Sequence, residues 1–237
     1  MNPENLQNES RFSPSSEWLY AILFVTTLVL VIWQHFGMTT RLLVIPGIAS
    51  AKPVLAHSDE LDGGASKMNI IDTDNSVGYD CQIIRSRTFA FCGINLPLTE
   101  PGKAGLNLKH YQTMEIEFDF QSEQRDTLLI YLMNNETDRN GNPVEKANLH
   151  AVYPKPGKNQ FRLSIPQFSA PSWWLFKNPN AAPESQLNAV THVRITTGDN
   201  ISERTTSLRV TRIVLHGKLI AADKLYFGLL LAWVILF

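Results

Sequence analysis

The stretch MEIEFDF, residues 114–120, alternates strictly between apolar and acidic side chains. Successive side chains of a β-strand point to opposite sides, so its four apolar residues fall on one face and its three carboxylates on the other. The stretch therefore predicts a strand with one buried and one solvated side. We interpret Glu115, Glu117 and Asp119 as that solvated side rather than as the paired acids of a glycosidase.

The same period of two recurs on both sides of this strand. Further strands are expected at KMNII (67–71), LLIYLMN (128–134), NLHAVY (148–153), FRLSI (161–165), VRITT (193–197) and SLRVTRIVLHG (207–217). The pair Asn140-Gly141 predicts a tight turn before the NLHAVY strand. In the last strand the apolar positions change parity, which predicts a β-bulge near Thr211.

This pattern predicts the fold class. About eight or nine strands, with no convincing amphipathic helix outside the apolar end segments, predict a mostly β protein built as an antiparallel jelly-roll sandwich. The chain has 237 residues, with 21 Lys and Arg against 22 Asp and Glu, and two cysteines. A formal charge of -1 provides no cationic field for nucleic acid, and two cysteines cannot form a disulfide-dense scaffold.

An uncharged segment near the N-terminus predicts a membrane span. Residues 18–40 carry no formal charge. As a helix they extend about 34 Å, enough for a hydrocarbon core of about 30 Å. The small-residue motif Ala49-Ser50-Ala51 raises the alternative of a cleaved signal peptide. We favour an uncleaved anchor, because the preceding segment is acidic and the motif lies far beyond the apolar run.

A second apolar run, LYFGLLLAWVILF, occupies residues 225–237. As a helix it extends only about 20 Å, so we expect the chain to be the front part of a longer protein. The predicted organisation is a cytoplasmic tail (1–17), a transmembrane helix (18–40), a juxtamembrane linker (41–62), a periplasmic β-sandwich input domain (63–220) and the truncated start of a second transmembrane helix (221–237).

The two cysteines bracket CQIIRSRTFAFC, residues 81–92. Its β-branched and aromatic content predicts two strands that turn near Ser86-Arg87, which would place Cys81 opposite Cys92. A disulfide between them would favour an oxidising compartment, in a bacterium the periplasm. The alternative is a pair of buried free thiols in a reducing compartment.

Motifs for catalysis and metal binding are missing from the sequence. It has no GxSxG, HExxH, P-loop or GxGxxG pattern, and its six histidines are scattered without ligand spacing. Asp72, Asp74 and Ser76 imitate the start of a calcium loop, but the glycine and glutamate that such a loop needs are absent. We therefore predict no catalytic residue, no metal site and no cofactor.

The candidate ligand-binding residues centre on Trp173-Trp174 in SAPSWWLF, residues 169–176. In an extended chain two adjacent side chains point in opposite directions, so one tryptophan would pack and the other would stack on a sugar ring or an apolar ligand. The alternative is a hydrophobic plug that closes the sandwich or rests on the membrane. Polar partners are expected from neighbouring predicted strands, at Asn134, Asn135, His150 and Arg162.

The order of these features resembles a known family. The segments that carry the resemblance are DGGAS (62–66), the predicted cysteine hairpin, GLNLKHYQTMEIEFDF (105–120), YLMNNE (131–136), SAPSWWLF (169–176), LNAVTHVRITTG (187–198) and RVTRIVLHGKLIAADKLYFGLLLAW (209–233). Over residues 18–237 the chain resembles the extracytoplasmic input region of bacterial membrane-bound GGDEF-type diguanylate cyclases. The resemblance implies a galactose-binding-like β-sandwich held between two transmembrane helices of the inner membrane.

The catalytic signature of that family, GG[DE]EF, is absent, because Gly63-Gly64 is followed by Ala-Ser-Lys. The resemblance therefore implies a sensory input region, not itself an enzyme, of a signal-transduction protein that makes cyclic di-GMP in its full form. Expected partners are membrane lipid, a carbohydrate, another small periplasmic ligand or a periplasmic protein, and a second copy in a homodimer, but not nucleic acid. Two alternatives stay open: the input half of a sensor histidine kinase, and a stand-alone membrane-tethered carbohydrate-binding or envelope protein.

Overall fold

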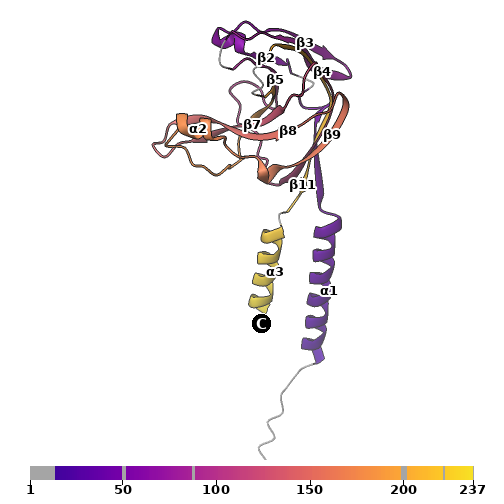
Figure 1. Cartoon of the computed structure of the whole chain (residues 1–237). Helices are drawn as coiled ribbons and strands as arrows, with labels where there is room; N and C mark the ends of the chain where they lie inside the picture. The colour runs from indigo at the N-terminus through magenta and orange to yellow at the C-terminus, as the bar shows by residue number, and fades with distance from the viewer. Residues whose placement is uncertain (1–13, 50–51, 87–88, 199–201, 221, 237) are drawn as a thin grey trace, which may run out of the picture. The chain divides into compact units, whose positions relative to one another are not determined.

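The computed structural model describes residues 14–49, 52–86, 89–198, 202–220 and 222–236 (Figure 1). The chain divides into two compact units, Thr40–Lys218 and a second unit of Met1–Thr39 with Leu219–Phe237. Three predicted features lie wholly or partly outside the described residues. They are the cytoplasmic tail over 1–17, the Ala49-Ser50-Ala51 motif and the turn at Ser86-Arg87.

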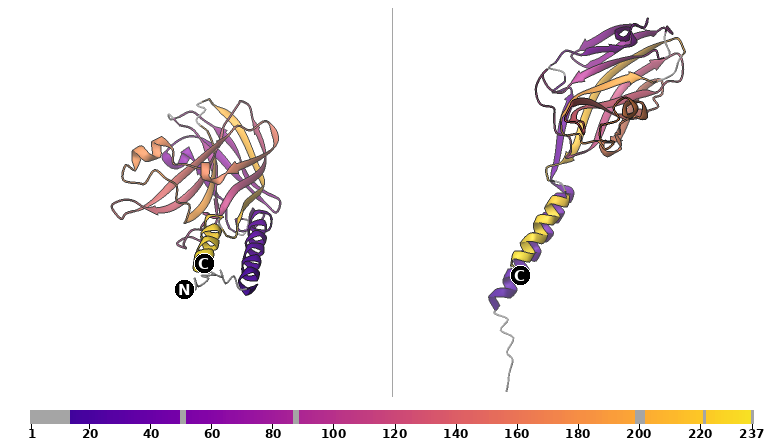
Figure 2. Two further views of the ribbon diagram at one scale, coloured as in Figure 1. Left: turned by 90° about the horizontal axis from the view of Figure 1, so that it is seen from below. Right: turned by 90° about the vertical axis from the view of Figure 1, so that its left-hand side faces the viewer.

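The unit Thr40–Lys218 is a sandwich of two β-sheets, seen from two further directions in Figure 2. The six-stranded sheet has the order β3 (Lys67–Thr73), β4 (Ser76–Ile83), β11 (Arg204–Lys218), β6 (Tyr111–Ser122), β9 (Gly157–Ser164), and β1 (Thr39–Ile45) also pairs with β11. The five-stranded sheet has the order β2 (Leu55–Ser58), β5 (Cys92–Pro97), β10 (Val190–Thr197), β7 (Leu128–Thr137), β8 (Pro143–Val152). The predicted mostly β, antiparallel sandwich is confirmed.

The core lies between the two sheets and follows the predicted alternation. The apolar side chains of MEIEFDF in β6, from Met114 to Phe120, are between 0 and 2% exposed. Burying each contributes about 1.5 to 3 kcal/mol. The predicted bulge is also confirmed, since the register of β11 against β6 shifts between Val210 and Arg212. Gly141 adopts a φ of 85° in the turn that joins β7 to β8, as the Asn-Gly pair predicts.

The predicted linker over residues 41–62 contains regular structure, so that part of the prediction is wrong. Strand β1 pairs with β11 and contributes Val44 and Ile45 to the core, and β2 pairs with β5. A 3₁₀ helix, Asp59–Asp62, follows β2. Both strands add to sheets made by distant parts of the chain, and composition does not reveal such pairing.

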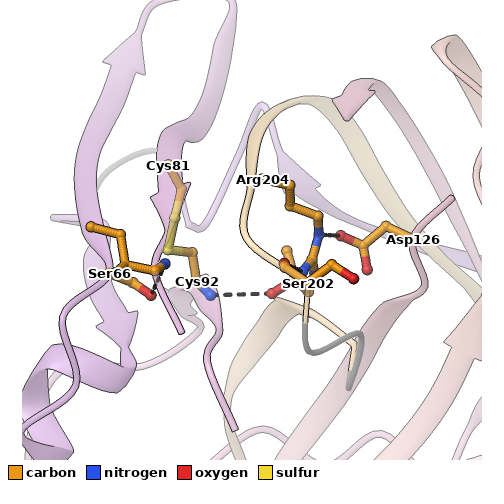
Figure 3. The surroundings of a disulfide bond; sticks show 8 residues. Ser66, Cys81, Cys92, Asp126, Ser202 and Arg204 are labelled. Carbon is orange, nitrogen blue, oxygen red and sulfur yellow. Dashed lines mark hydrogen bonds and ion pairs between the residues drawn. A yellow bond between two sulfur atoms is a disulfide. The ribbon is translucent and has the colours of Figure 1, made fainter. Parts of the chain in front are cut away.

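The disulfide between Cys81 and Cys92 is present, but the predicted hairpin is wrong. Cys81 lies on β4 of the six-stranded sheet and Cys92 on β5 of the five-stranded sheet, so the bond joins the two sheets across the core (Figure 3). Strands β4 and β5 belong to different sheets and therefore do not pair as the two arms of one hairpin. Close by, Arg204 and Asp126 form an ion pair of 2.6 Å between side chains with no exposed surface (Figure 3).

Helices account for the remaining elements. The second unit holds α1 (Pro14–Phe36) and α3 (Ala222–Leu236), and the indole nitrogen of Trp233 donates a hydrogen bond of 3.0 Å to the Thr27 hydroxyl. Among the described helices, α1 has the length and mean hydropathy, 1.9 over Glu17–Phe36, to cross a membrane, and an N-terminal signal sequence meets the same criteria. The sandwich adds a 3₁₀ turn, Ile165–Gln167, and α2 (Ser172–Lys177).

Candidate ligand-binding face

The outward side of the five-stranded sheet carries a cluster of polar side chains, most of them half-buried. In β10, Val193 and Ile195 point into the core, so His192 and Arg194 point outward. Residues directly opposite each other in neighbouring strands share a side of the sheet, which extends the cluster to both neighbours of β10. We call this surface the five-stranded face. Its polar residues are His57 of β2, Asn95 of β5, Tyr131 of β7, Glu145 of β8, and His192 and Arg194 of β10.

Arg194 is the centre of the five-stranded face, opposite Asn95 on one side and Tyr131 on the other. Its Nε donates a hydrogen bond of 2.7 Å to Asn95 Oδ1, and its Nη2 lies 3.4 Å from Nε2 of His192. Among the described residues no ion pair includes Arg194. Burial lowers the pKa of Arg194, and the charge of Glu145 opposes that effect. The guanidinium is therefore a half-buried cation whose bonded partners are neutral.

Two neutral histidines accompany this cation. Burial, and then the positive charge of Arg194, lower the pKa of His57 to about 4 against a smaller opposing effect of Asp62. The pKa of His192 is also lowered to about 4, by burial, by Arg194 and by His57. Both rings are uncharged at neutral pH. The 3.8 Å approach of His192 to Glu145 is consequently not an ion pair there, because only a protonated imidazole would make it one.

Helix α2 lies against the five-stranded face at the β7–β8 side (Figure 1). Trp174 is buried there, packed with Tyr131 and Met133, and its Nε1 donates a hydrogen bond of 3.2 Å to the Glu145 carbonyl. Trp173 points away, with 49% of its surface exposed. One tryptophan thus packs and its neighbour is open, as predicted. The predicted extended chain is wrong, because adjacent residues of a helix diverge by about 100°.

Two further side chains extend the exposed aromatic surface of α2. Phe176, three residues after Trp173, is 88% exposed, and helical residues three apart lie on the same side. The ammonium of Lys177 lies 5.6 Å from the centre of the Trp173 ring, within the range of a cation–π contact. The helix therefore presents flat apolar rings to solvent on the β7–β8 side of the sheet.

The polar residues predicted as partners of the tryptophans do not gather at one place. Asn134 is fully buried, where it accepts a hydrogen bond from the amide of Ala189 and donates one to Glu136, each of 2.8 Å. His150 lies on the inner side of β8 beside Phe168. These contacts position the backbone and leave neither side chain facing the Trp173 surface.

The other two predicted partners are exposed, on different sheets. Asn135 follows Asn134 on β7 and points outward, opposite Glu145. Arg162 lies on β9 of the six-stranded sheet, opposite Glu115. Of the four predicted partners, Asn135 alone lies on the same sheet side as the Arg194 cluster.

Sequence reasoning missed most of the five-stranded face. The alternation in VTHVRITT was sufficient to place His192 and Arg194 outward, but it carries no information on which strands flank β10. His57 lies on β2, within the range 41–62 that was predicted to be a linker without strands. Asn95 lies in β5, a strand that begins at Cys92, where the predicted cysteine hairpin ended.

The six-stranded face, the outward side of the other sheet, has a different character. It holds an open groove of about 730 Å³, whose polar lining includes Lys67, Asn69, Asp80, Gln121, Thr205 and Ser207. Two of its arginines are neutralised by carboxylates: Arg209 lies 2.6 Å from Asp80, and Arg212 lies 2.8 Å from Glu117. A hydrogen bond from Arg209 is the main cause that lowers the pKa of Asp80. The prediction that the MEIEFDF carboxylates form a solvated outer side is confirmed.

The fold is similar to that of carbohydrate-binding modules. A family 11 module of the cellulosomal cellulase Lic26A-Cel5E of Clostridium thermocellum has 12% identity and a TM-score of 0.50, covering 78% of this chain and 97% of the module. A family 11 module of Clostridium thermocellum in complex with a β-1,3-1,4-mixed-linked tetrasaccharide has 13% identity and a TM-score of 0.49, covering 77% and 98%. A family 29 module complexed with cellulohexaose has 7% identity and a TM-score of 0.38, covering 76% and 92%.

Neither a protein-family model nor a curated protein sequence matches the chain. At 12% identity the first of these likenesses shows a shared β-sandwich fold and nothing finer. It agrees with the predicted galactose-binding-like sandwich, and the link to diguanylate cyclases stays a prediction.

Proposed function

We propose that Thr40–Lys218 is a non-catalytic ligand-binding domain for saccharides, and that the five-stranded face binds the ligand. The observation that carries this proposal is the polar cluster around the half-buried Arg194, on the same sheet side on which α2 packs and exposes the ring of Trp173. A sugar offers both complements: hydroxyl groups that hydrogen-bond to amides, imidazoles and guanidinium, and an apolar ring face that stacks on an indole. The fold shared with a carbohydrate-binding module supports the same conclusion.

The domain is proposed to lie outside the cytoplasm, in the periplasm of a bacterium, anchored to the inner membrane by α1. Two observations support this location. Helix α1 has the length and hydropathy of a span. The disulfide between Cys81 and Cys92 is typical of an oxidising compartment. The apolar helix α3 would then begin a second anchor, with residues 1–17 in the cytoplasm.

We further propose that ligand binding is signalled through these two helices to a diguanylate cyclase domain. Strand β1 begins three residues after α1 ends, β11 ends four residues before α3 begins, and β1 and β11 pair directly. A change in this pair would therefore reach both helices, which are linked by the Thr27–Trp233 hydrogen bond. The ligand would shift the population between two helix arrangements, in a homodimer between two pairings of the output domains. The resemblance of residues 18–237 favours this output over a histidine kinase or a protein without output.

Binding is tested with the full chain in lipid nanodiscs, using a glycan array followed by calorimetry on the saccharides that bind. We expect Trp173→Ala and Asn95→Ala each to weaken binding at least about fivefold, because each removes one recognition contact of about 1 kcal/mol or more. Gln121→Ala, in the groove of the six-stranded face, is the matched control and is expected to leave affinity unchanged. Loss of binding in the control together with full binding in the first two variants would assign the site to the other sheet.

A further inference from the structure

Three strand arginines form ion pairs, and Arg194 differs from them. Arg204, Arg209 and Arg212 each have a carboxylate oxygen within 2.6 to 2.8 Å. Arg194 has an amide oxygen and an imidazole nitrogen instead, and no ion pair among the described residues. Because a guanidinium has five N–H donors, the bonds to Asn95 and His192 leave donors on both terminal nitrogens. A partly desolvated cation with spare donors is a receptor for an anion.

We infer that the natural ligand carries a carboxylate that pairs with Arg194, and is therefore an acidic saccharide of the uronic acid class. This inference rests on the proposed saccharide-binding function of the same face. A carboxylate matches the planar fork of guanidinium and can accept two parallel hydrogen bonds from it. Glu145, which interacts electrostatically with Arg194, disfavours a ligand with two negative charges close together.

The groups around Arg194 leave room for the rest of a sugar to be recognised. The side-chain amide of Asn95 uses its oxygen on Arg194, so its NH₂ group is free to donate to a hydroxyl. The neutral ring of His57 provides one donor and one acceptor nitrogen. Trp173 offers a stacking surface at the α2 side. A charged oligosaccharide could thus place a carboxylate on Arg194 while its neighbouring sugar units use these other groups.

The histidines make a second property of this site testable, its dependence on pH. The charged and titratable groups near His57 and His192 are Arg194, Asp62 and Glu145, and Tyr131 interacts with Arg194. A bound carboxylate would partly cancel the charge of Arg194 and would raise the pKa of both rings from about 4. The complex would then take up protons, so affinity increases as pH falls, until the ligand carboxylate itself is protonated near its pKa of roughly 3.5.

The test compares three ligands of equal length on the full chain in nanodiscs: an oligogalacturonate, its methyl ester and a neutral glucan oligomer. The methyl ester keeps the sugar and removes the charge. We expect the acid to bind at least about tenfold more tightly than its ester, the scale of one charge-assisted hydrogen bond. Between pH 7.5 and pH 5.0 the dissociation constant for the acid should fall by roughly threefold or more, and that for the ester should not change.

Two variants test the assignment to Arg194. Arg194→Gln should lower affinity for the acid about tenfold or more, whereas Arg209→Gln, on the six-stranded face, should not affect it. Asn95→Asp keeps the shape of the side chain and provides Arg194 with a counter-ion 2.7 Å from its Nε. It should weaken acid binding as strongly as Arg194→Gln, with a melting temperature equal to or above that of the unchanged protein. This second variant separates loss of the site from loss of folding.

The outcomes distinguish this inference from the proposed function. Equal affinity for acid and ester, or an unchanged affinity in Arg194→Gln, would overturn the acidic ligand while saccharide binding stands. Preference for a sulfated saccharide of equal length over the oligogalacturonate would overturn the carboxylate. Failure of every saccharide, charged and neutral, to bind the folded chain would overturn the proposed function itself.

Discussion

The two outward faces of the sandwich carry similar residue types and differ in how their charges are satisfied. On the six-stranded face two arginines form ion pairs, Arg209 with Asp80 and Arg212 with Glu117, and this face also carries the polar groove. On the five-stranded face Arg194 is half-buried with neutral partners, and α2 covers part of the sheet. The face with the groove is therefore not the better binding candidate. Unsatisfied, partly desolvated groups give a ligand more to gain than groups that already satisfy one another.

The largest expected effect concerns the packing of α2 onto the five-stranded face. Trp174→Ala should destabilise the domain by about 3 to 5 kcal/mol, because it removes a buried indole and its hydrogen bond to the Glu145 carbonyl. Trp173→Ala, one residue earlier and half exposed, should change stability by no more than about 0.5 kcal/mol. Urea denaturation of both variants measures the difference. Equal destabilisation would mean that α2 does not pack as described, and the contrast between a covered and a bare face would fail.

The next effect concerns the bond that holds the two sheets together. Replacing both cysteines with Ser should cost about 3 kcal/mol, the chain-entropy value for a closed loop of this length, with sequence separation 11. Reduction of the unchanged protein should lower its stability by a similar amount, and the reductant should have no effect on the double variant. If the double variant were as stable as the oxidised protein, the disulfide would contribute nothing measurable, and the packing of the core alone would hold the two sheets together.

Prediction from sequence succeeded where a signal is local and failed where it depends on distant partners. Three local predictions depend only on neighbouring residues, and the structure confirms them: the alternation in MEIEFDF, the Asn140-Gly141 turn and the bulge near Thr211. The predicted cysteine hairpin failed because Cys81 and Cys92 belong to different sheets. Local alternation cannot distinguish a strand that folds back on its neighbour from one that crosses the core.

The candidate site shows the same division. That one tryptophan of Trp173-Trp174 packs and the other is open was predictable from their adjacency, although the helix was not. The cluster around Arg194 was not predictable, because it combines side chains from β2, β5, β7, β8 and β10, whose order in the sheet differs from their order in the chain. His57 and His192 come together across well over a hundred residues of chain.

The two faces are expected to lose their contributions to folding stability over different pH ranges. The pKa of His57 and that of His192 are lowered to about 4, from about 6.5 in an unfolded chain, so the unfolded state binds more protons between these values. Stability should therefore fall as pH drops from about 6.5 to 4, by at most about 1.4 kcal/mol per pH unit for each histidine. Asp80 and Glu115 of the six-stranded face have lowered pKa values instead, so their stabilisation is fully present above about 4.5 and is lost only below it.

Urea denaturation at a series of pH values tests this assignment. A variant with both His57→Gln and His192→Gln should lose the decline between pH 6.5 and 4.5 and keep the decline at lower pH. If the double variant kept the decline between pH 6.5 and 4.5, the titrating groups would lie elsewhere, and the description of His57 and His192 as partly buried, neutral rings would fail.

The smallest effect is expected on the six-stranded face. Arg209→Gln removes the ion pair with Asp80, whose side chain is 51% exposed. Exposed pairs of this kind contribute less than about 1 kcal/mol, since water and salt screen them and two long side chains must be held in place. The loss should shrink further as salt is raised, and urea denaturation in low and high salt measures it. A destabilisation above about 2 kcal/mol would show that this face also depends on buried charge, because a solvated pair cannot supply that much.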